Sequence, residues 1–128
     1  MENIRIERTD RTPEVNFDFT DNRFALRGES YPEDVPAFFG PPFSALEHHL
    51  KGLQTGQVTF SFEMIYFNST SAKVVMKLLG LLEETAGRGV AVTVNWCFKA
   101  DDDNMRELGE EFGEDMETAT FHMCPTDK

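Results

Sequence analysis

The centre of the chain alternates between two kinds of apolar spacing. Residues 58–67 place an apolar side chain at every second position, as a β-strand does. Residues 70–86 then space apolar side chains three and four positions apart, as on a helix face, and residues 90–98 return to strand alternation. A strand, a long apolar helix and another strand restrict the chain to a sheet with helices packed on it.

The N-terminal third has strand signals of its own. Residues 4–6 and 15–19 alternate apolar with polar side chains. The turn signal at residues 20–22 predicts a hairpin, with residues 24–27 as the returning strand. A helix is expected to follow, with Ser30 as its N-cap. Two adjacent prolines, at residues 41 and 42, are expected to kink this helix or split it.

The C-terminal third predicts one more helix and one more strand. Residues 101–103 are three aspartates that suit the N-terminus of a short helix, and residues 118–123 favour a closing strand. The predicted order is β-β-β-α-β-α-β-α, followed by this β. We therefore predict one α/β domain over residues 1–128, with a mixed β-sheet and helices packed on it.

Burial can be predicted for the central elements. Tyr66 continues the apolar face of its strand, while Ile65 and Phe67 make the other face apolar, which favours a strand covered on both sides. The helix at residues 70–86 is more apolar than a one-sided helix needs. Either it is buried from two sides, or it offers an apolar strip to a partner. Cys97 is expected to be a small core residue.

The charge excludes some classes of partner. The formal net charge is −11, and the segment after Ala100 carries ten acidic residues against two basic ones. Such a surface repels phosphate backbones and anionic lipid, so we expect neither a nucleic-acid partner nor membrane insertion. It suits a basic protein partner, or it serves only solubility. Without an apolar leader segment, a cytoplasmic protein is expected.

The turn between the central strand and the long helix carries the strongest functional signal. Ser69, Thr70 and Ser71 follow Asn68 and are expected to be exposed beside a helix N-terminus. A helix cap needs only one such side chain. We interpret the turn as a phosphorylation site. A plain helix cap is the alternative.

Other chemistry has little support. No histidine is placed by sequence near the hydroxyls, so a nucleophile with a base is not predicted and the protein is expected not to be an enzyme. The aspartates at residues 101–103 lack the glycine and the final glutamate of a calcium loop. There is no glycine-rich phosphate loop, and no cofactor or metal is predicted.

Four segments together resemble a known family. They are residues 28–33 (GESYPE), 66–73 (YFNSTSAK), 81–84 (LLEE) and 107–112 (ELGEEF). From about residue 15 to about residue 115, the chain resembles the SiaC family of bacterial regulatory phosphoproteins. That family is similar in fold to the STAS domains of anti-sigma factor antagonists, so the resemblance implies a STAS-like α/β fold.

The resemblance also implies a partner-switching function. The unphosphorylated protein is expected to bind and stimulate a diguanylate cyclase, which makes cyclic-di-GMP and promotes biofilm formation. A Ser/Thr protein kinase would block this interaction, and a PP2C-type phosphatase would restore it. By position, the acceptor is the residue after Asn68, which is Ser69, with Thr70 as the other candidate.

Further residues are expected to serve the same site. Asn68 shapes and caps the turn, Ser71 completes it, and Lys73 is placed to pair with a phosphate. Tyr31 and Glu33 are weaker candidates for partner contact. The remaining hypotheses are an antagonist that binds an anti-sigma kinase, and a small-molecule-binding domain with a pocket around Trp96 and Tyr66.

Overall fold

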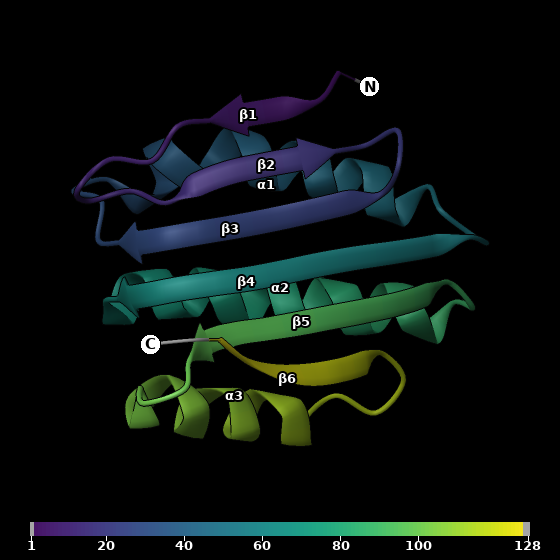
Figure 1. Cartoon of the computed structure of the whole chain (residues 1–128). Helices are drawn as coiled ribbons and strands as arrows, with labels where there is room; N and C mark the ends of the chain where they lie inside the picture. Colours follow the sequence, from purple (N-terminus) through teal and green to yellow (C-terminus); the bar gives the residue numbers. More distant parts are fainter. Residues whose placement is uncertain (1, 127–128) are drawn as a thin grey trace.

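The computed structural model describes residues 2–126, which form one sheet and three helices (Figure 1). The elements in chain order are β1 (Ile4–Ile6), β2 (Glu14–Asp18), β3 (Arg23–Ser30), α1 (Val35–Lys51), β4 (Gln57–Phe67), α2 (Ser69–Gly87), β5 (Ala91–Lys99), α3 (Asp103–Glu114) and β6 (Thr120–Thr126). The predicted order of elements is confirmed, including the closing strand.

The sheet is mixed, as predicted. Its six strands lie side by side in chain order from β1 to β6. β1, β2 and β3 pair antiparallel, whereas β3, β4, β5 and β6 pair parallel. Each parallel connection contains one helix, because a chain must cross the sheet before it can pair in the same direction again.

The helices cover one face of the sheet. Figure 1 shows α1 and α2 behind the strands, with α3 beside β6 at the edge of the sheet. The side chains under the helices are buried and apolar, as in Phe60, Phe62, Val94 and Trp96. The opposite face carries half-exposed polar residues such as Ser61. The expectation that the central strand is covered on both sides is therefore wrong.

α2 is apolar on more than one side because it has neighbours on more than one side. It packs on β5 and lies against α1. Val74, Leu78 and Leu81 are buried, so the first of the two alternatives for this helix, burial from two sides, is confirmed. Met76 is 58% exposed and lies outside the buried surface.

A shift in strand register exchanges the roles of two aromatic residues. Gly28 pairs with Met64, but Glu29 pairs with Tyr66, so Ile65 has no partner in β3. One extra residue turns all later side chains to the opposite face. Phe67 is therefore buried and Tyr66 is half exposed, which reverses the faces expected from strict alternation.

α1 starts later than predicted and is not split. Ser30 is the last residue of β3, and Asp34 is the N-cap, with its carboxylate accepting from the Ala37 N–H at 3.1 Å. The helix runs without a break through both prolines. Its buried residues recur at helical intervals before and after the proline pair, so one continuous face packs on the core; they are Phe39, Pro42, Leu46 and Leu50.

Cys97 lies on the open face of the sheet rather than in the core. It is half exposed and pairs in register with Cys124 on β6. Burial of the thiol, together with the neighbouring Cys124, raises the pKa of Cys97 to about 12. The expectation of a core cysteine is wrong because the period of two places this odd-numbered position with Ser61 and Asn95, away from Trp96.

The contact between α3 and β5 depends on a glycine. A Cβ atom at Gly109 would lie 2.7 Å from Trp96 Nε1 and 2.8 Å from Met123 Cε. We expect Gly109→Ala to lower the free energy of unfolding by about 1–3 kcal/mol through overpacking. Urea unfolding measures this change.

Gly80→Ala is the matched control, because Gly80 also lies inside a helix but has no atom within 4 Å of such a Cβ. It should be neutral or stabilising by up to about 1 kcal/mol, as expected from helix propensity. Equal effects of the two substitutions would contradict the close approach of α3 to Trp96.

Candidate functional site

Asn68 organises the turn between β4 and α2. It is the N-cap of α2, and its side-chain oxygen accepts from the Ser71 N–H at 2.9 Å. The same oxygen accepts from the Thr70 hydroxyl at 3.0 Å. The Asn68 N–H donates to the Ser30 carbonyl at 3.1 Å, so the turn is also tied to the end of β3. The predicted capping role of Asn68 is confirmed.

The three hydroxyls of the turn have different environments. Ser69 is exposed, and within residues 2–126 its hydroxyl makes no hydrogen bond. Thr70 is exposed as well, but its hydroxyl is engaged by Asn68. Ser71 is only 1% exposed, so the expectation that all three are exposed is wrong for Ser71. Of the three, Ser69 is the exposed hydroxyl without a protein partner.

Ser71 is buried because it has a partner on the neighbouring strand. Its hydroxyl and that of Ser30 lie 2.8 Å apart, and Ser30 is also 1% exposed. This pair satisfies two buried hydroxyls that would otherwise destabilise the fold. Sequence reasoning missed Ser30 as part of the site, since it assigned this residue to a helix cap. Extension of β3 through Ser30 would have placed it beside the turn.

Lys73 lies one turn along α2 from Ser69. Its side chain is exposed and, in the described part of the chain, is not in an ion pair. Residues three and four positions apart are neighbours on a helix surface, so Lys73 can approach a group carried by Ser69 or Thr70. The structure thus brings Asn68, Ser69, Thr70 and Lys73 together, as predicted.

Tyr31 lies beside the turn through its contact with Tyr66. The two rings meet edge to face with centroids 5.9 Å apart. Glu33 is on the same loop, and its carboxylate accepts from Arg11 at 2.8 Å in an exposed ion pair. The structure therefore places Tyr31 in the aromatic surface next to the turn, whereas Glu33 is directed to Arg11.

Exposed apolar side chains lie next to the turn and farther along α2. Ile65 and Tyr66 at the end of β4 are 45% and 50% exposed, and Met76 lies on α2 two turns after Ser69. Together they are the large apolar side chains exposed in residues 2–126. Ile65 and Tyr66 are neighbours at the end of β4, so exposed apolar surface lies directly beside the turn, as is common at protein contact surfaces.

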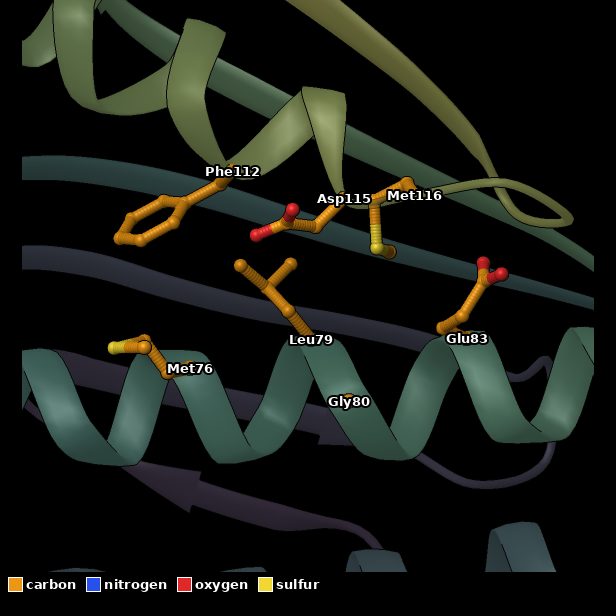
Figure 2. A pocket seen from close by; sticks show the side chains of 7 residues that line it. All are labelled: Met76, Leu79, Gly80, Glu83, Phe112, Asp115 and Met116. Atoms are coloured by element: carbon orange, nitrogen blue, oxygen red, sulfur yellow. The ribbon is translucent and has the colours of Figure 1, made fainter.

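A hollow separates α2 from α3 (Figure 2). It measures about 260 Å³, and the side chains that line it are Met76, Leu79, Gly80, Glu83, Phe112, Asp115 and Met116. Figure 2 shows Phe112, Asp115 and Met116 directed from α3 toward the side chains of α2. Sequence reasoning did not find this hollow, because nothing in the residue pattern sets the spacing between the two helices.

Glu83 closes one end of the hollow by binding the chain after α3. Its carboxylate accepts from the backbone N–H groups of Glu117, Thr118 and Ala119. Burial raises the pKa of Glu83, but hydrogen bonds from these three backbone groups outweigh that effect, so its pKa is lowered overall. The charged form of Glu83 thus fixes the segment between α3 and β6 against α2.

Several other kinds of site find no support in this geometry. Trp96 is 1% exposed and its indole N–H donates to the Met105 carbonyl, so it cannot form a pocket wall with the exposed Tyr66. In residues 2–126, His, Cys, Asp and Glu side chains nowhere gather in threes that suit a metal ion. None of the described helices has both the length and the apolar character needed to cross a membrane.

Comparison with known proteins places the chain in a family. Its sequence matches the SiaC family of regulatory phosphoproteins over residues 6–126. The chain belongs to the SiaC family. A protein of Pseudomonas aeruginosa strain UCBPP-PA14 is 32% identical over 115 residues, which cover 90% of each chain. The resemblance inferred from the four sequence segments is confirmed.

Solved structures of SiaC agree with the fold. The crystal structure of apo-SiaC from Pseudomonas aeruginosa matches with a TM-score of 0.85 and 31% identity, covering 97% of this chain and 99% of that one. A structure of the diguanylate cyclase SiaD in complex with its activator SiaC, from the same organism, matches at 0.89 and 30% identity, covering 96% and 99%. The α/β fold class is confirmed.

The role of Glu83 leads to a prediction about stability. Glu83→Ala should lower the free energy of unfolding by about 1–3 kcal/mol at pH 7, because three backbone donors lose a charged acceptor. Glu84→Ala is the control, since Glu84 makes a single exposed ion pair with Arg88 at 3.6 Å, worth at most about 1 kcal/mol.

The same contact has a pH dependence of known sign. Because folding lowers the pKa of Glu83, its contribution is present above the pKa of the unfolded chain. It is lost as the pH falls through the folded pKa. Chemical unfolding at a series of pH values should therefore show the wild type and Glu83→Ala converging in acid. A difference that persists unchanged at low pH would contradict a role for the charged form.

Proposed function

We propose that the protein is a non-enzymatic phospho-switch that activates a diguanylate cyclase in its unphosphorylated form. The SiaC family consists of regulatory phosphoproteins, and SiaC of Pseudomonas aeruginosa is the activator of the cyclase SiaD. The observation that carries the proposal is Ser69, an exposed hydroxyl without a protein partner at the first position of α2. Cyclic-di-GMP signalling and biofilm regulation are the corresponding processes.

The environment of the three hydroxyls supports Ser69 as the acceptor. Transfer of a phosphoryl group to Ser69 breaks no hydrogen bond in the described structure. At Thr70 it would remove a hydroxyl donor from Asn68, and at Ser71 it would place a dianion in the core. Burying a charge without partners is strongly unfavourable, so Ser71 is excluded as an acceptor in the folded protein.

The position also explains how a modification can change binding and leave the fold intact. A phosphate adds between one and two negative charges at the positive end of the α2 dipole, where negative charge is stabilising. Lys73 supplies a counter-charge one turn away. A partner that packs on Tyr66 and Ile65 would instead meet a hydrated dianion beside an apolar contact, which weakens binding.

The switch requires two further enzymes, a Ser/Thr protein kinase and a PP2C-type phosphatase. The protein itself supplies the substrate surface: the turn at residues 68–71, with Lys73 on one side and Tyr31 and Tyr66 on the other. We place the partner contact on this surface, with the protein acting in the cytoplasm.

Ser69→Asp tests the switch. It should weaken binding to the SiaD-type cyclase of the same bacterium by about tenfold or more, by analogy with charges placed in other interfaces. Its melting temperature should stay close to that of the wild type, because the helix N-terminus tolerates an acidic residue. Calorimetric titration and thermal unfolding measure the two quantities. Wild-type affinity in Ser69→Asp would count against the proposal.

Ser71→Asp is the contrasting variant. It should lower the free energy of unfolding by about 2 kcal/mol or more, since a carboxylate would replace a buried hydroxyl bonded to Ser30. The two substitutions add the same charge two residues apart. Similar stability of both proteins would show that Ser71 is not buried as described.

Intact-mass and phosphopeptide analysis of protein from its native cells identifies the acceptor. The expected result is a gain of one phosphoryl group on Ser69, which disappears in Ser69→Ala and persists in Thr70→Ala. Phosphate found on Thr70 alone would reassign the acceptor. Absence of phosphate in cells lacking the phosphatase would leave Asn68 and the hydroxyls as a helix cap only.

A further inference from the structure

Two cysteines lie side by side on the open face of the sheet. Cys97 on β5 and Cys124 on β6 are partners in the parallel register, and both are half exposed. The Cys124 thiol lies 4.0 Å from the side-chain oxygen of Asn95, whose amide donates to the Ser61 hydroxyl at 3.3 Å on this face. Both thiols are therefore on the same side of the same pair of strands.

The spacing of these two strands suits a disulfide bond. Neighbouring strands lie about 4.8 Å apart. The Cα atoms of disulfide-bonded cysteines are usually about 4.4–6.8 Å apart, so register partners fall inside this range without a movement of the backbone. A thiol is a weak hydrogen-bond donor, so the contact with Asn95 does not prevent the Cys124 side chain from turning toward Cys97.

A hollow of about 200 Å³ adjoins Cys97 on this face and is rich in positive charge. Three of the side chains that line it are cationic, those of Arg8, Arg27 and Lys99, and Glu63 is the carboxylate among them. Glu63 pairs with Arg27, whereas neither Arg8 nor Lys99 is in an ion pair within residues 2–126. In a chain with a net charge of −11, this hollow favours an anionic reagent beside the thiol.

The two thiols differ in how they react. Burial, together with the neighbouring Cys124, raises the pKa of Cys97 to about 12, so Cys97 keeps its proton at neutral pH. Thiolates are the nucleophiles in thiol–disulfide exchange, so Cys124, on the edge strand, reacts first. Once its sulfur is in a disulfide, Cys124 no longer raises the pKa of Cys97, while the nearby Arg27 still lowers it. Cys97 is then better able to react second.

We propose that Cys97 and Cys124 form a reversible redox site that is oxidised by a low-molecular-weight disulfide carrying carboxylates. The Cys124 thiolate attacks one sulfur of the reagent, whose S–S bond breaks, and one half leaves as a thiol with the proton that Cys124 released. Cys97 then gives up its proton and attacks the Cys124 sulfur, which expels the second half as a thiol. The reagent is reduced by two electrons, and the two cysteines are oxidised to one disulfide. This inference does not rest on the proposed function.

The bond restrains the C-terminal part of the chain. It closes a loop over residues 98–123, which contains α3, and it joins the edge strand β6 covalently to β5. Closing such a loop lowers the entropy of the unfolded chain and so stabilises the fold. Because both cysteines are half exposed, a reductant reaches the bond, and exposed disulfides are the readily reduced ones. The site thus links β6 to β5 or releases it without a change in fold.

Reaction of the purified chain with oxidised glutathione, a disulfide that carries carboxylates, tests the site. Intact-mass analysis of the wild type should show the loss of two hydrogen atoms and no retained glutathione, and peptide mapping should link Cys97 to Cys124. Dithiothreitol should reverse the change. Cys97→Ser should instead retain one glutathione on Cys124, because no second thiol is left to expel it. A wild type that stays reduced, or that retains glutathione as Cys97→Ser does, overturns the proposal.

Thermal unfolding measures the restraint on the loop. The oxidised wild type should melt about 5 °C or more above the reduced wild type. Cys97→Ser and Cys124→Ser should melt close to the reduced wild type and should not gain stability from the reagent, because neither can form the bond. Equal melting temperatures of the two redox forms would contradict the restraint on residues 98–123.

A pair of charge reversals tests the role of the hollow. Lys99→Glu and Lys77→Glu change the net charge equally and both lysines are exposed, but Lys99 lines the hollow whereas Lys77 is on α2. At low ionic strength, Lys99→Glu should slow the first exchange with oxidised glutathione about threefold relative to Lys77→Glu. With 2-hydroxyethyl disulfide, a neutral reagent, the two variants should react at equal rates. Equal rates with both reagents would overturn the assignment of an anionic reagent.

Discussion

Parallel pairing of β3, β4, β5 and β6 determines where everything else in this protein lies. Each parallel connection must cross the sheet, and all three crossings use the same face. The three helices therefore begin at the same end of the sheet, the C-terminal edge, where the parallel strands β3, β4 and β5 end. This edge collects the N-terminus of α2, the end of β3 and the start of α3. A turn that would be an ordinary connection elsewhere becomes the centre of a surface built from distant parts of the chain.

Within this edge, two local features sort the side chains. The register shift at Ile65 turns Tyr66 outward and Phe67 inward, so an exposed aromatic residue stands beside the turn while a buried one anchors it. The cap at Asn68 then orders the hydroxyls that follow. The Ser71 hydroxyl is hydrogen-bonded to Ser30, and the Thr70 hydroxyl donates to Asn68. Of the three, only the Ser69 hydroxyl has no hydrogen-bond partner in the described structure. The chemical difference among three similar residues thus comes from packing and not from their side-chain types.

Much of the fold could be predicted from the sequence, because it rests on periodic patterns. Alternation in β4 and β5, helical spacing in α2 and the caps at Asn68 and Asp102 are local, and three of the four family segments lie on β4, α2 and α3. The errors have long-range causes. Ser30 was assigned to a helix because its partner, Ser71, lies 41 residues away. Cys97 was expected in the core, and β4 was expected to be covered on both faces. Both expectations are wrong, because local patterns do not reveal that all three helices pack on a single face of the sheet.

The candidate site was predicted only where its residues are neighbours in the sequence. Asn68, Ser69, Thr70 and Lys73 are neighbours in sequence, so their proximity needed no tertiary information. Tyr31 was expected near the site, and its contact with Tyr66 depends on the pairing of β3 with β4. The hollow between α2 and α3 was not predicted, because the spacing of helices on a sheet depends on tertiary packing, such as the close approach of Gly109 to Trp96, which local patterns do not show.

The uncovered face of the sheet has a consequence for how such proteins diverge. Side chains there, such as Asn16, Ser61, Thr93 and Asn95, contribute little to the core, and they can be exchanged for other polar residues at small cost. The opposite positions on the same strands cannot vary in this way. Relatives at about a third sequence identity can therefore accumulate substitutions on one side of the sheet while the helix layer, and the edge at which the helices begin, keep their geometry.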